Sequence, residues 1–529
     1  MNRRVRIKIG VSTVAVAMAL TACGGGGNAT TAAGGNSSGP SASQANSDAQ
    51  LKVGFTVPTP ALNPHKVVSA PAAFPYLTPI YDRLTQMKDV DGTLTLAPMV
   101  ATEWAFAPDG KSATFTLRDG VTFSDGAVLD AAAVKATLDH AKNAPGSTVA
   151  NYFSMIDSVN VIDPKHVEIK VNRQAADLPY VLSGVEASLI SPAALDNPDL
   201  DVKPVGSGPY VATEIKIGDS ASYARRDGYW EPEAQLAKTI NIKGFPDGNA
   251  RLNALRSGQV DIINFSVGQY AQATNLGNGF GHFAYPPSQV YSLYMNIDKP
   301  NLNNQKVRQA LNFAVDREGI NKSLLNGQCT PTSQPLTGPM DGFLKNPPVN
   351  YTYDKDKARS LLAEAGVTNL TIDASVGAGL SPQTDLAAAL AAQFGEVGVT
   401  LNVQPSDVIE AITRYAQKGQ DSMVQVRVSD PSSAQSLARN YVNPRQFPGT
   451  TPPELVSALA PAYDPSTSAK DVTVALEKAS SVVNEQALDV FICAVGTQFA
   501  YSDKVIGANS MGVSHYAGYP DLRYVGLSK

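Results

Sequence analysis

The side chains that bind metals or act as nucleophiles are few and widely separated in this sequence. The five histidines contain no i,i+4 pair and no His-Glu-x-x-His motif, so zinc chemistry has little support. They are His65, His140, His166, His282 and His515. We therefore predict surface or capping roles for the histidines, and neither a metal site nor a bound cofactor.

Two short motifs match parts of enzyme signatures but lack the rest. Gly206-Ser207-Gly208 is not a G-x-S-x-G nucleophile elbow, because Val205 and Pro209 stand at the outer glycine positions. Gly110-Lys111-Ser112 matches the end of a P-loop, yet Ala105 replaces the first glycine of that motif. We predict no catalytic residues and a protein that is not an enzyme.

Cys23 ends a segment that has the pattern of a secretory signal peptide. Basic residues near the start precede an apolar run from Ile9 to Leu20, and small residues lead to Cys23. The apolar run is shorter than the ~20 residues that a membrane-spanning helix requires. We predict that residues 1–22 are a leader peptide and that the protein is exported.

The stretch Leu20-Thr21-Ala22-Cys23 resembles the lipobox of bacterial lipoproteins. This resemblance implies lipid chains on Cys23 and a location at the outer face of the bacterial cytoplasmic membrane, in the periplasm or cell-wall space. Residues 23–50 are rich in Gly, Ser, Ala, Asn and Thr, a composition that cannot bury a core. We predict a flexible tether with an average span of about 30 Å.

Charge and cysteine content narrow the class of protein further. The chain has 42 Lys and Arg against 47 Asp and Glu, a net charge of −5, with no basic block after the leader. Nucleic-acid binding needs a concentrated basic face, so we predict no nucleic-acid partner. With Cys23 assigned to lipid, Cys329 and Cys493 remain, and they either pair or stay as buried thiols.

Helix and strand patterns are mixed from Leu51 onward, which favours an α/β fold with at least two lobes. Asp-Gly pairs between residues 105 and 126 predict tight turns that connect antiparallel strands. A further strand is expected over residues 399–403. Amphipathic spacing predicts helices after Asp130, Asn304 and Asp354, and over residues 386–394.

Several segments match a known family in their order and separation. They are Leu62-Asn63-Pro64, Tyr81-Asp82-Arg83-Leu84, Leu96-Ala97-Pro98, Glu103-Trp104, residues 109–126, residues 204–210, Tyr229-Trp230, residues 255–261, Asn296, residues 307–317 and Tyr353-Asp354. Together they resemble the peptide/nickel class, family 5, of extracellular solute-binding proteins, the capture subunits of bacterial ABC importers. The matches cover most of residues 51–366.

This resemblance implies a two-lobed periplasmic-binding-protein-like clam of the cluster C type, with an inserted subdomain in lobe I. The expected segments are 51–78, 204–292 and 496–529 for lobe I, 79–203 for the inserted subdomain, and 293–495 for lobe II. Crossings between the lobes are expected near residues 293–296 and 495–498. Trp104 and Trp230 are expected in cores, and Gly206 and Gly208 at a backbone turn.

Peptide-binding members hold the α-amino group of the ligand with an aspartate of lobe II, in a Trp-x-x-Asp-x-x-Asp-Pro motif. Here Val424 and Arg427 occupy the tryptophan and amine-binding positions, whereas Asp430-Pro431 matches the end of the motif. A guanidinium repels an ammonium group, so a free peptide N-terminus is an unsuitable ligand.

The resemblance leaves the role of Arg427 open. Arg427 either binds a carboxylate or phosphate of the ligand or pairs with Asp430, unless the match is shifted by one to three residues. Tyr291 and Tyr294, on the approach to the first crossing, either supply aromatic walls or pack in a core. We predict Arg427, Asp430, Tyr291 and Tyr294 as ligand-binding residues.

The combined expectation is a monomeric, membrane-anchored solute-binding subunit of an ABC importer. It closes on a peptide-like or other small organic solute and delivers that solute to permease subunits. The alternative is a surface lipoprotein that binds a ligand for sensing or adhesion without transport. Genes for a permease and an ATPase beside this one would favour import.

Overall fold

The computed structural model describes residues 45–67, 69–90, 93–338, 340–508 and 521–529. The leader 1–22, Cys23 and His515 lie outside these ranges, so what the sequence predicts for them remains a prediction. Within the described ranges, no helix is both long and apolar enough to cross a membrane.

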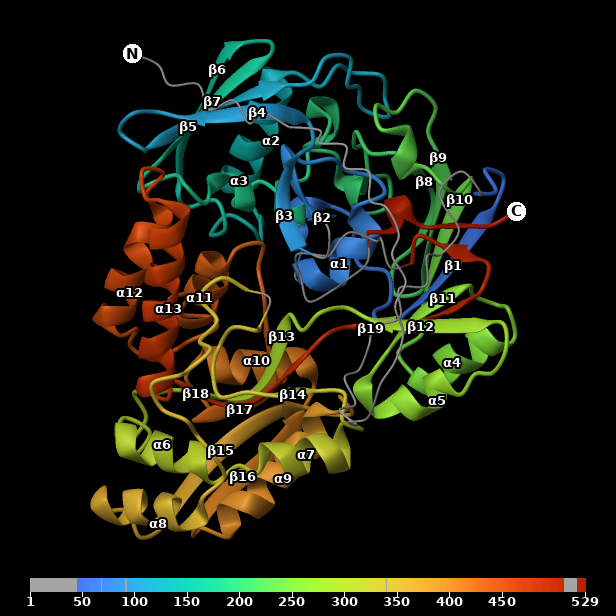
Figure 1. Cartoon of the computed structure of the whole chain (residues 1–529). Coiled ribbons are helices and arrows are strands. Elements are labelled where there is room, and N and C mark those ends of the chain that lie inside the picture. Colours follow the sequence, from blue (N-terminus) through green and yellow to red (C-terminus); the bar gives the residue numbers. More distant parts are fainter. Residues whose placement is uncertain (1–44, 68, 91–92, 339, 509–520) are drawn as a thin grey trace, which may run out of the picture. The chain divides into compact units, whose positions relative to one another are not determined.

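Lobe I is built around a seven-stranded mixed sheet (Figure 1). Its strands, in order across the sheet, are β12 (Phe280–Ala284), β19 (Gln498–Ser502), β11 (Ile262–Phe265), β1 (Gln50–Phe55), β10 (Thr239–Gly244), β9 (Ser220–Arg225) and β8 (Tyr210–Lys216). Helix α1 (Ala70–Leu77) shares a core with Ile262, whereas α4 (Gly248–Arg256) and α5 (Tyr270–Thr274) share one with Ile263. Because neighbouring strand residues point to opposite faces, both faces of this sheet are covered.

The start of lobe I differs from the predicted tether 23–50. Ala45 forms an isolated β-bridge with Ser528, and the Asn46 amide donates to the Leu527 carbonyl at 2.8 Å. The second partner belongs to the short pair β20 (Val505–Ile506) and β21 (Gly526–Leu527). Residues 45–50 therefore belong to the folded body.

The inserted subdomain has its own core around Phe115, Leu138 and Val167. Its elements are the hairpin β2 (Thr85–Val90) and β3 (Thr93–Pro98), the four-stranded sheet of β4 (Ala101–Phe106), β5 (Ser112–Leu117), β7 (His166–Val171) and β6 (Ile156–Asp163), and the helices α2 (Ala131–Asn143) and α3 (Leu178–Val181). The antiparallel β4–β5 pair confirms the hairpin predicted from Asp109-Gly110, and Gly110 has the positive φ of 68° that such turns use. Trp104 and Trp230 pack at the edge of this core.

Gly206 and Gly208 lie where the chain bends at residues 207–209 and also allow close packing of two backbone segments. A Cβ atom on Gly206 would lie 2.3 Å from the Ile80 carbonyl oxygen, and one on Gly208 would lie 2.5 Å from the Ile80 carbonyl carbon. The Gly208 amide donates to that same oxygen at 2.7 Å. The two glycines thus let the chain that enters β8 lie against the segment that leads into the inserted subdomain.

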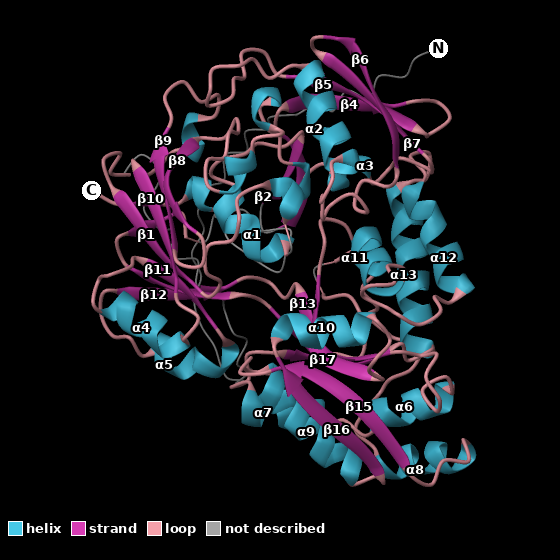
Figure 2. Ribbon diagram, turned by 180° about the vertical axis from the view of Figure 1, so that it is seen from behind, coloured by secondary structure: helices cyan, strands magenta, loops and turns pink. Residues whose placement is uncertain are grey.

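Lobe II contains a six-stranded sheet with helices on both faces (Figure 2). The strands, in order across the sheet, are β14 (Thr330–Pro331), β18 (Asp489–Val495), β13 (Gln289–Met295), β17 (Ser422–Val428), β15 (Leu370–Gly377) and β16 (Val399–Ser406). The helices are α6 (Gln305–Phe313), α7 (Arg317–Leu324), α8 (Lys355–Glu364), α9 (Gln383–Gly395), α10 (Val408–Ala416), α11 (Ser433–Tyr441), α12 (Pro453–Leu459) and α13 (Ala469–Glu485). Helix α9 shares a core with Val424 and α10 shares one with Met423, which places these two helices on opposite faces of β17.

The sheet topology places the first crossing earlier than the predicted residues 293–296. β12 belongs to the lobe I sheet and β13 to the lobe II sheet, so the chain crosses at residues 285–288. The second crossing, between β18 and β19, lies at residues 496–497, inside the predicted range 495–498. The two crossings are hydrogen-bonded, because the Tyr285 amide donates to the Thr497 carbonyl at 3.0 Å.

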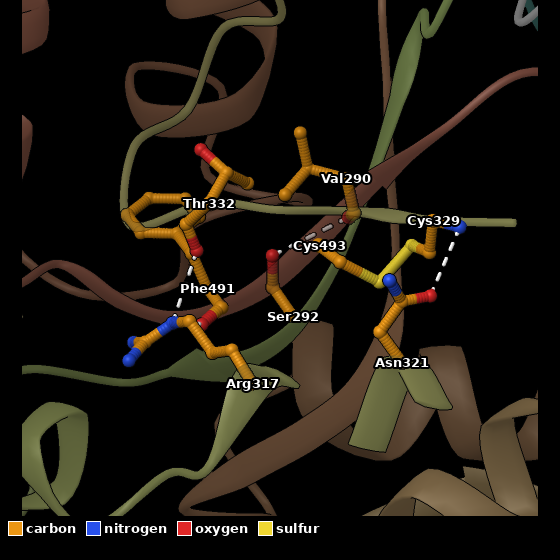
Figure 3. The surroundings of a disulfide bond; sticks show 8 residues. All are labelled: Val290, Ser292, Arg317, Asn321, Cys329, Thr332, Phe491 and Cys493. Atoms are coloured by element: carbon orange, nitrogen blue, oxygen red, sulfur yellow. Dashed lines mark hydrogen bonds between the residues drawn. A yellow bond between two sulfur atoms is a disulfide. The ribbon is translucent and has the colours of Figure 1, made fainter. Parts of the chain in front are cut away.

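Cys329 and Cys493 form a disulfide bond in lobe II (Figure 3). Their Cα atoms lie 5.7 Å apart, within the range that a disulfide requires. The bond joins the residue just before β14 to β18, and the Cys329 amide also donates to the Asn321 side chain at 3.1 Å. The two cysteines therefore pair and do not remain as buried thiols. A disulfide agrees with an oxidising compartment.

Candidate functional site

The carboxyl ends of the parallel strands in lobe II face the crossings. β15 runs parallel to β17, whereas β13 runs antiparallel to β17 and pairs Gln289, its first residue, with Val428 at the end of β17. Val495, the last residue of β18, lies opposite the same Gln289. Ligands of open α/β sheets bind at the carboxyl ends of parallel strands, so this edge is the candidate site of lobe II.

In lobe I, too, the carboxyl ends of the parallel strands face the crossings. β1 is parallel to both β10 and β11, and the first residue of β19, Gln498, pairs with Phe265 at the end of β11. We call residues 56–63, 266–270, 378–382 and 429–432, which follow β1, β11, β15 and β17, together with the crossings 285–288 and 496–497, the strand-end segments.

The two lobes touch directly at the strand-end segments and beside them. The Asn326 side chain of lobe II donates to the Val267 carbonyl of lobe I at 3.0 Å, and the Val267 side chain packs in the lobe II core. A Cβ atom on Gly268 would lie 3.7 Å from Oγ of Ser381. The two candidate edges are therefore close enough for one small solute to contact both.

Arg427 does not point to this edge but is buried inside lobe II. Its side chain is 1% exposed and forms a two-pronged ion pair with Asp489, with Nε–Oδ2 at 2.8 Å and Nη2–Oδ1 at 2.9 Å. Nη1 donates to the Gln446 carbonyl at 3.0 Å, and the guanidinium lies 3.4 Å from the centre of the Tyr294 ring. Burial alone would lower the pKa of Arg427, but the Asp489 carboxylate raises it well above its ordinary value, so the group stays charged.

This environment corrects the two roles predicted for Arg427. Its ion-pair partner is Asp489, not Asp430, and its guanidinium lacks the exposure that a ligand contact needs. Sequence reasoning missed Asp489. Asp489 is the single acidic residue in the otherwise apolar run 488–495. Because a carboxylate in a buried strand requires a partner, this pattern could have indicated a buried ion pair.

Asp430 lies on the strand-end segment that follows β17. Its Oδ1 accepts from Arg439 at 2.8 Å, and its amide donates to the Ser436 hydroxyl at 2.8 Å. Its Oδ2 is buried and has no hydrogen-bond partner. Burial raises the pKa of this carboxyl, although Arg439 opposes the effect. Of the four predicted ligand-binding residues, Asp430 is the one that the fold places in a strand-end segment.

The two predicted tyrosines lie within β13. Tyr294 is buried, and its ring is the platform for the Arg427 guanidinium, so it belongs to the ion-pair site and not to the strand ends. Tyr291 is half-buried, lies opposite Val426 of β17, and packs against the lobe II core. The fold therefore brings Arg427 and Tyr294 together but keeps both away from Asp430.

Two further polar groups, one in the first crossing and one directly after the second, were not predicted. Oγ of Ser288 and Oε1 of Gln498 are buried without hydrogen-bond partners, like Oδ2 of Asp430. Ser288 is a neighbour of the β17 end, since its carbonyl accepts from the Ser429 amide at 3.1 Å. Nothing in the local sequence marks these residues, because their position depends on which strands the crossings connect.

Two α/β lobes joined by two crossings, with parallel strand ends facing those crossings, form a periplasmic-binding-protein-like fold. The family of bacterial extracellular solute-binding proteins, family 5 middle, matches residues 95–449. The chain therefore belongs to the family 5 extracellular solute-binding proteins, as its segments predicted.

Similar proteins are known both by sequence and by structure. The chain is 31% identical to the glutathione-binding protein GsiB of Pectobacterium atrosepticum over 283 residues, 53% of this chain and 54% of that protein. It thus spans about half the length of the curated relatives that it matches. DppA of Helicobacter pylori, in complex with the peptide STSA, has a TM-score of 0.80 at 20% identity, over 91% of this chain and 98% of that one. NikZ of Campylobacter jejuni, in complex with Ni(L-His), has a TM-score of 0.77 at 21% identity, over 90% and 99%.

Proposed function

We propose that this protein is the extracytoplasmic solute-binding subunit of an ABC importer. The observation that carries the proposal is the family match over residues 95–449, on a fold whose two sheets direct their parallel strand ends toward the same crossings. Such sheets bind small molecules at their strand ends. The matching family is one of solute-binding proteins, so the proposal is binding and delivery rather than chemistry.

Capture proceeds by rotation of the lobes about the two crossings. Each crossing is short, and hinges of this kind absorb the φ and ψ changes of domain closure in a few residues. Closure removes water from the bound solute and so strengthens the polar contacts made by the strand-end segments. The closed form is the state that we propose permease subunits receive.

The cargo is proposed to be a peptide-like or other small organic solute. The relatives at 31% identity are named glutathione-binding proteins, and the solved neighbours hold a peptide and a nickel–histidine complex. Arg427 stands where peptide-binding members have the aspartate that holds the α-amino group, and it pairs with Asp489 inside lobe II. A free peptide N-terminus is therefore not the proposed anchor.

Cys23 is proposed to hold the protein at the outer face of the membrane through lipid. The basic start, the apolar run and the sequence from Leu20 to Cys23 support this proposal. Mass spectrometry of the mature N-terminus should find acyl chains on Cys23, and the Cys23→Ser variant should be released from the membrane fraction. A wild-type protein that is recovered unacylated in the soluble fraction would contradict the anchor.

Small-angle scattering of the purified protein, with and without a metabolite extract, tests solute capture. Closure on a solute should reduce the radius of gyration, and mass spectrometry of the released small molecules identifies the cargo. Scattering curves that superimpose before and after addition would contradict the proposal. A role in sensing or adhesion would give closure as well, but deletion of the gene would then leave uptake of that cargo unchanged.

A further inference from the structure

The inserted subdomain contacts lobe II at residues that belong to neither crossing. The Ala176 amide, between β7 and α3, donates to the Tyr463 carbonyl at 2.9 Å. Tyr463 ends the short helix η8 (Ala460–Tyr463), which lies between α12 and α13. A Cβ atom on Gly110, in the turn between β4 and β5, would lie 3.1 Å from Cδ of Pro465. We call residues 110, 173–177 and 461–465 the interlobe contact.

The interlobe contact joins two different hydrophobic cores. Ala175 and Leu178 belong to the core of the inserted subdomain, whereas Ala462 and Tyr463 pack in a core of lobe II. Along the chain the inserted subdomain is connected to lobe I, because α1 precedes it and β8 follows it. Chain connectivity therefore does not hold the inserted subdomain against lobe II, and the contact depends on the groups that the two surfaces present.

Arg173 is held in position for this contact. Its Nη1 and Nη2 atoms donate to the two carboxylate oxygens of Asp177, at 2.8 and 2.7 Å, and the Asp177 side chain is 3% exposed. The guanidinium lies 4.2 Å from the centre of the Tyr463 ring, where a cation is attracted to the aromatic face. Arg173 and Asp177 both belong to the inserted subdomain, so their ion pair does not depend on lobe II. Little conformational entropy is therefore lost when the Tyr463 ring approaches.

We propose that the interlobe contact is a latch that stabilises the closed form and thereby raises the affinity for solute. This inference rests on the proposed function, because it requires rotation of the lobes about the crossings. The hydrogen bond from Ala176 to Tyr463 does not survive a separation of the lobes by more than about 1 Å, so the latch exists only in the closed form. Interactions made only in the closed form increase its population, and the apparent affinity of a solute that binds this form rises with that population.

The variant Ala176→Pro weakens the latch from the inserted subdomain. Ala176 is the second residue of a turn that is closed by the Leu178 amide, which donates to the Ala175 carbonyl at 2.9 Å. Proline is favoured at this position of a turn, so the local fold should be kept. The substitution removes the amide donor and places a ring carbon toward the Tyr463 carbonyl.

The variant Tyr463→Leu weakens the latch from lobe II. It removes the ring that faces Arg173 but keeps an apolar side chain against the lobe II core. Tyr353→Leu is the matched control, because Tyr353 is an exposed tyrosine that lies beside a cation, Lys355, within lobe II.

Small-angle scattering of the purified protein during titration with a metabolite extract measures the effect on closure. Half of the full decrease in the radius of gyration should require at least about fivefold more extract in Ala176→Pro and in Tyr463→Leu than in the wild type, whereas Tyr353→Leu should match the wild type. If thermal unfolding shows that Ala176→Pro does not fold, Tyr463→Leu decides the test. Equal midpoints in the variants and the wild type would overturn the latch and leave the importer role intact. A wild type that does not close with the extract would contradict both.

Hydrogen exchange followed by mass spectrometry separates a latch from a local structural role. In the wild type, the extract should slow exchange of the Ala176 amide by at least about fivefold, because this amide gains its partner in lobe II only on closure. Strand β7, in the core of the inserted subdomain, should exchange at the same rate with and without extract. Unchanged exchange in residues 173–178, together with a smaller radius of gyration, would show that closure does not make the contact and would overturn the inference.

Discussion

At the scale of single residues, Arg427 and Asp489 depend on each other for stability. Both side chains are buried, so Arg427→Ala leaves the Asp489 carboxylate without its partner and should lower the free energy of unfolding of lobe II by about 3–5 kcal/mol. Urea unfolding followed by circular dichroism measures the change. The double variant R427L/D489L should recover much of the loss, because it removes both charges together.

A matched control for this pair is the exposed ion pair of Arg414 with Glu410 on α10. Arg414→Ala should lower the free energy of unfolding by less than about 1 kcal/mol, because water solvates the remaining carboxylate. If Arg427→Ala unfolded like the wild type but lost affinity for solute, Arg427 would be a ligand residue after all and its buried position would not represent the bound state.

His65 links the stability of lobe I to pH. Its Nδ1 lies 2.7 Å from Nδ1 of His140, and burial together with His140 lowers the pKa of His65 to about 3. In the unfolded chain the ordinary value of about 6.5 applies. The unfolded state therefore binds the proton first, so this stabilisation is complete above pH 6.5 and is lost as the pH falls toward 3, by up to about 1.4 kcal/mol per pH unit.

Denaturant unfolding at pH 7.0, 5.5 and 4.5 measures this dependence, and the variant His65→Gln isolates it from the carboxylates. The wild type should lose more stability than His65→Gln as the pH falls. His282→Gln replaces an exposed histidine and should follow the wild type. Parallel pH profiles of the wild type and His65→Gln would contradict the proposed protonation.

At the scale of elements, the helices could be predicted because their signals are local. Asp130, Asn304 and Asp354 each accept a hydrogen bond from an amide in the first turn of the helix that follows, as their spacing before apolar positions indicated. The first crossing could not be placed in the same way. The run 289–295 has the composition of a strand in either lobe, and its sheet is decided by pairing with β17 and β18, far away in the sequence.

One residue of the candidate site was predicted, from the family motif and not from local patterns. Asp430-Pro431 matches the end of that motif, and the fold places Asp430 directly after β17. The partner of Arg427, in contrast, lies 62 residues away on another strand, and no local pattern joins the two. The orphaned acceptors Ser288 and Gln498 are defined by the crossings, so their burial could not be read before the sheets were assembled.

The disulfide between Cys329 and Cys493 is expected to stabilise the folded protein. It joins Cys329, just before β14, to Cys493 in β18, across a sequence separation of 164 residues. The double variant Cys329→Ala/Cys493→Ala should unfold with a free energy lower by about 2–5 kcal/mol, because the unfolded chain regains the freedom that the bond removes. Thermal unfolding of the wild type with and without reductant measures the same difference. Equal midpoints in all three samples would show that the bond does not form or does not contribute.

At the scale of the whole molecule, the proposed function depends on two crossings that hold the lobes together and still allow rotation. Tyr285 and Thr497 are hydrogen-bonded across them, and the Ser288 amide donates to the Val495 carbonyl at 3.2 Å. On either side of the crossings lie two sheets of different strand order. We therefore expect closure to change the backbone mainly in residues 285–288 and 496–497, while the strand ends keep their geometry.

Gly496 lies where the two crossings pack closely against each other. A Cβ atom there would lie 1.9 Å from the Tyr285 carbonyl oxygen, so Gly496→Ala must push the two crossings apart. We expect a thermal midpoint lower by several degrees and a changed radius of gyration in scattering, because the hinge is altered while both cores stay intact. Gly395→Ala on α9 is the control, since its Cβ would meet no atom within 4 Å and alanine favours the helix. If Gly496→Ala kept the melting temperature and the solute-dependent closure of the wild type, the crossings would be looser than their contacts imply, and the rotation axis would have to lie elsewhere.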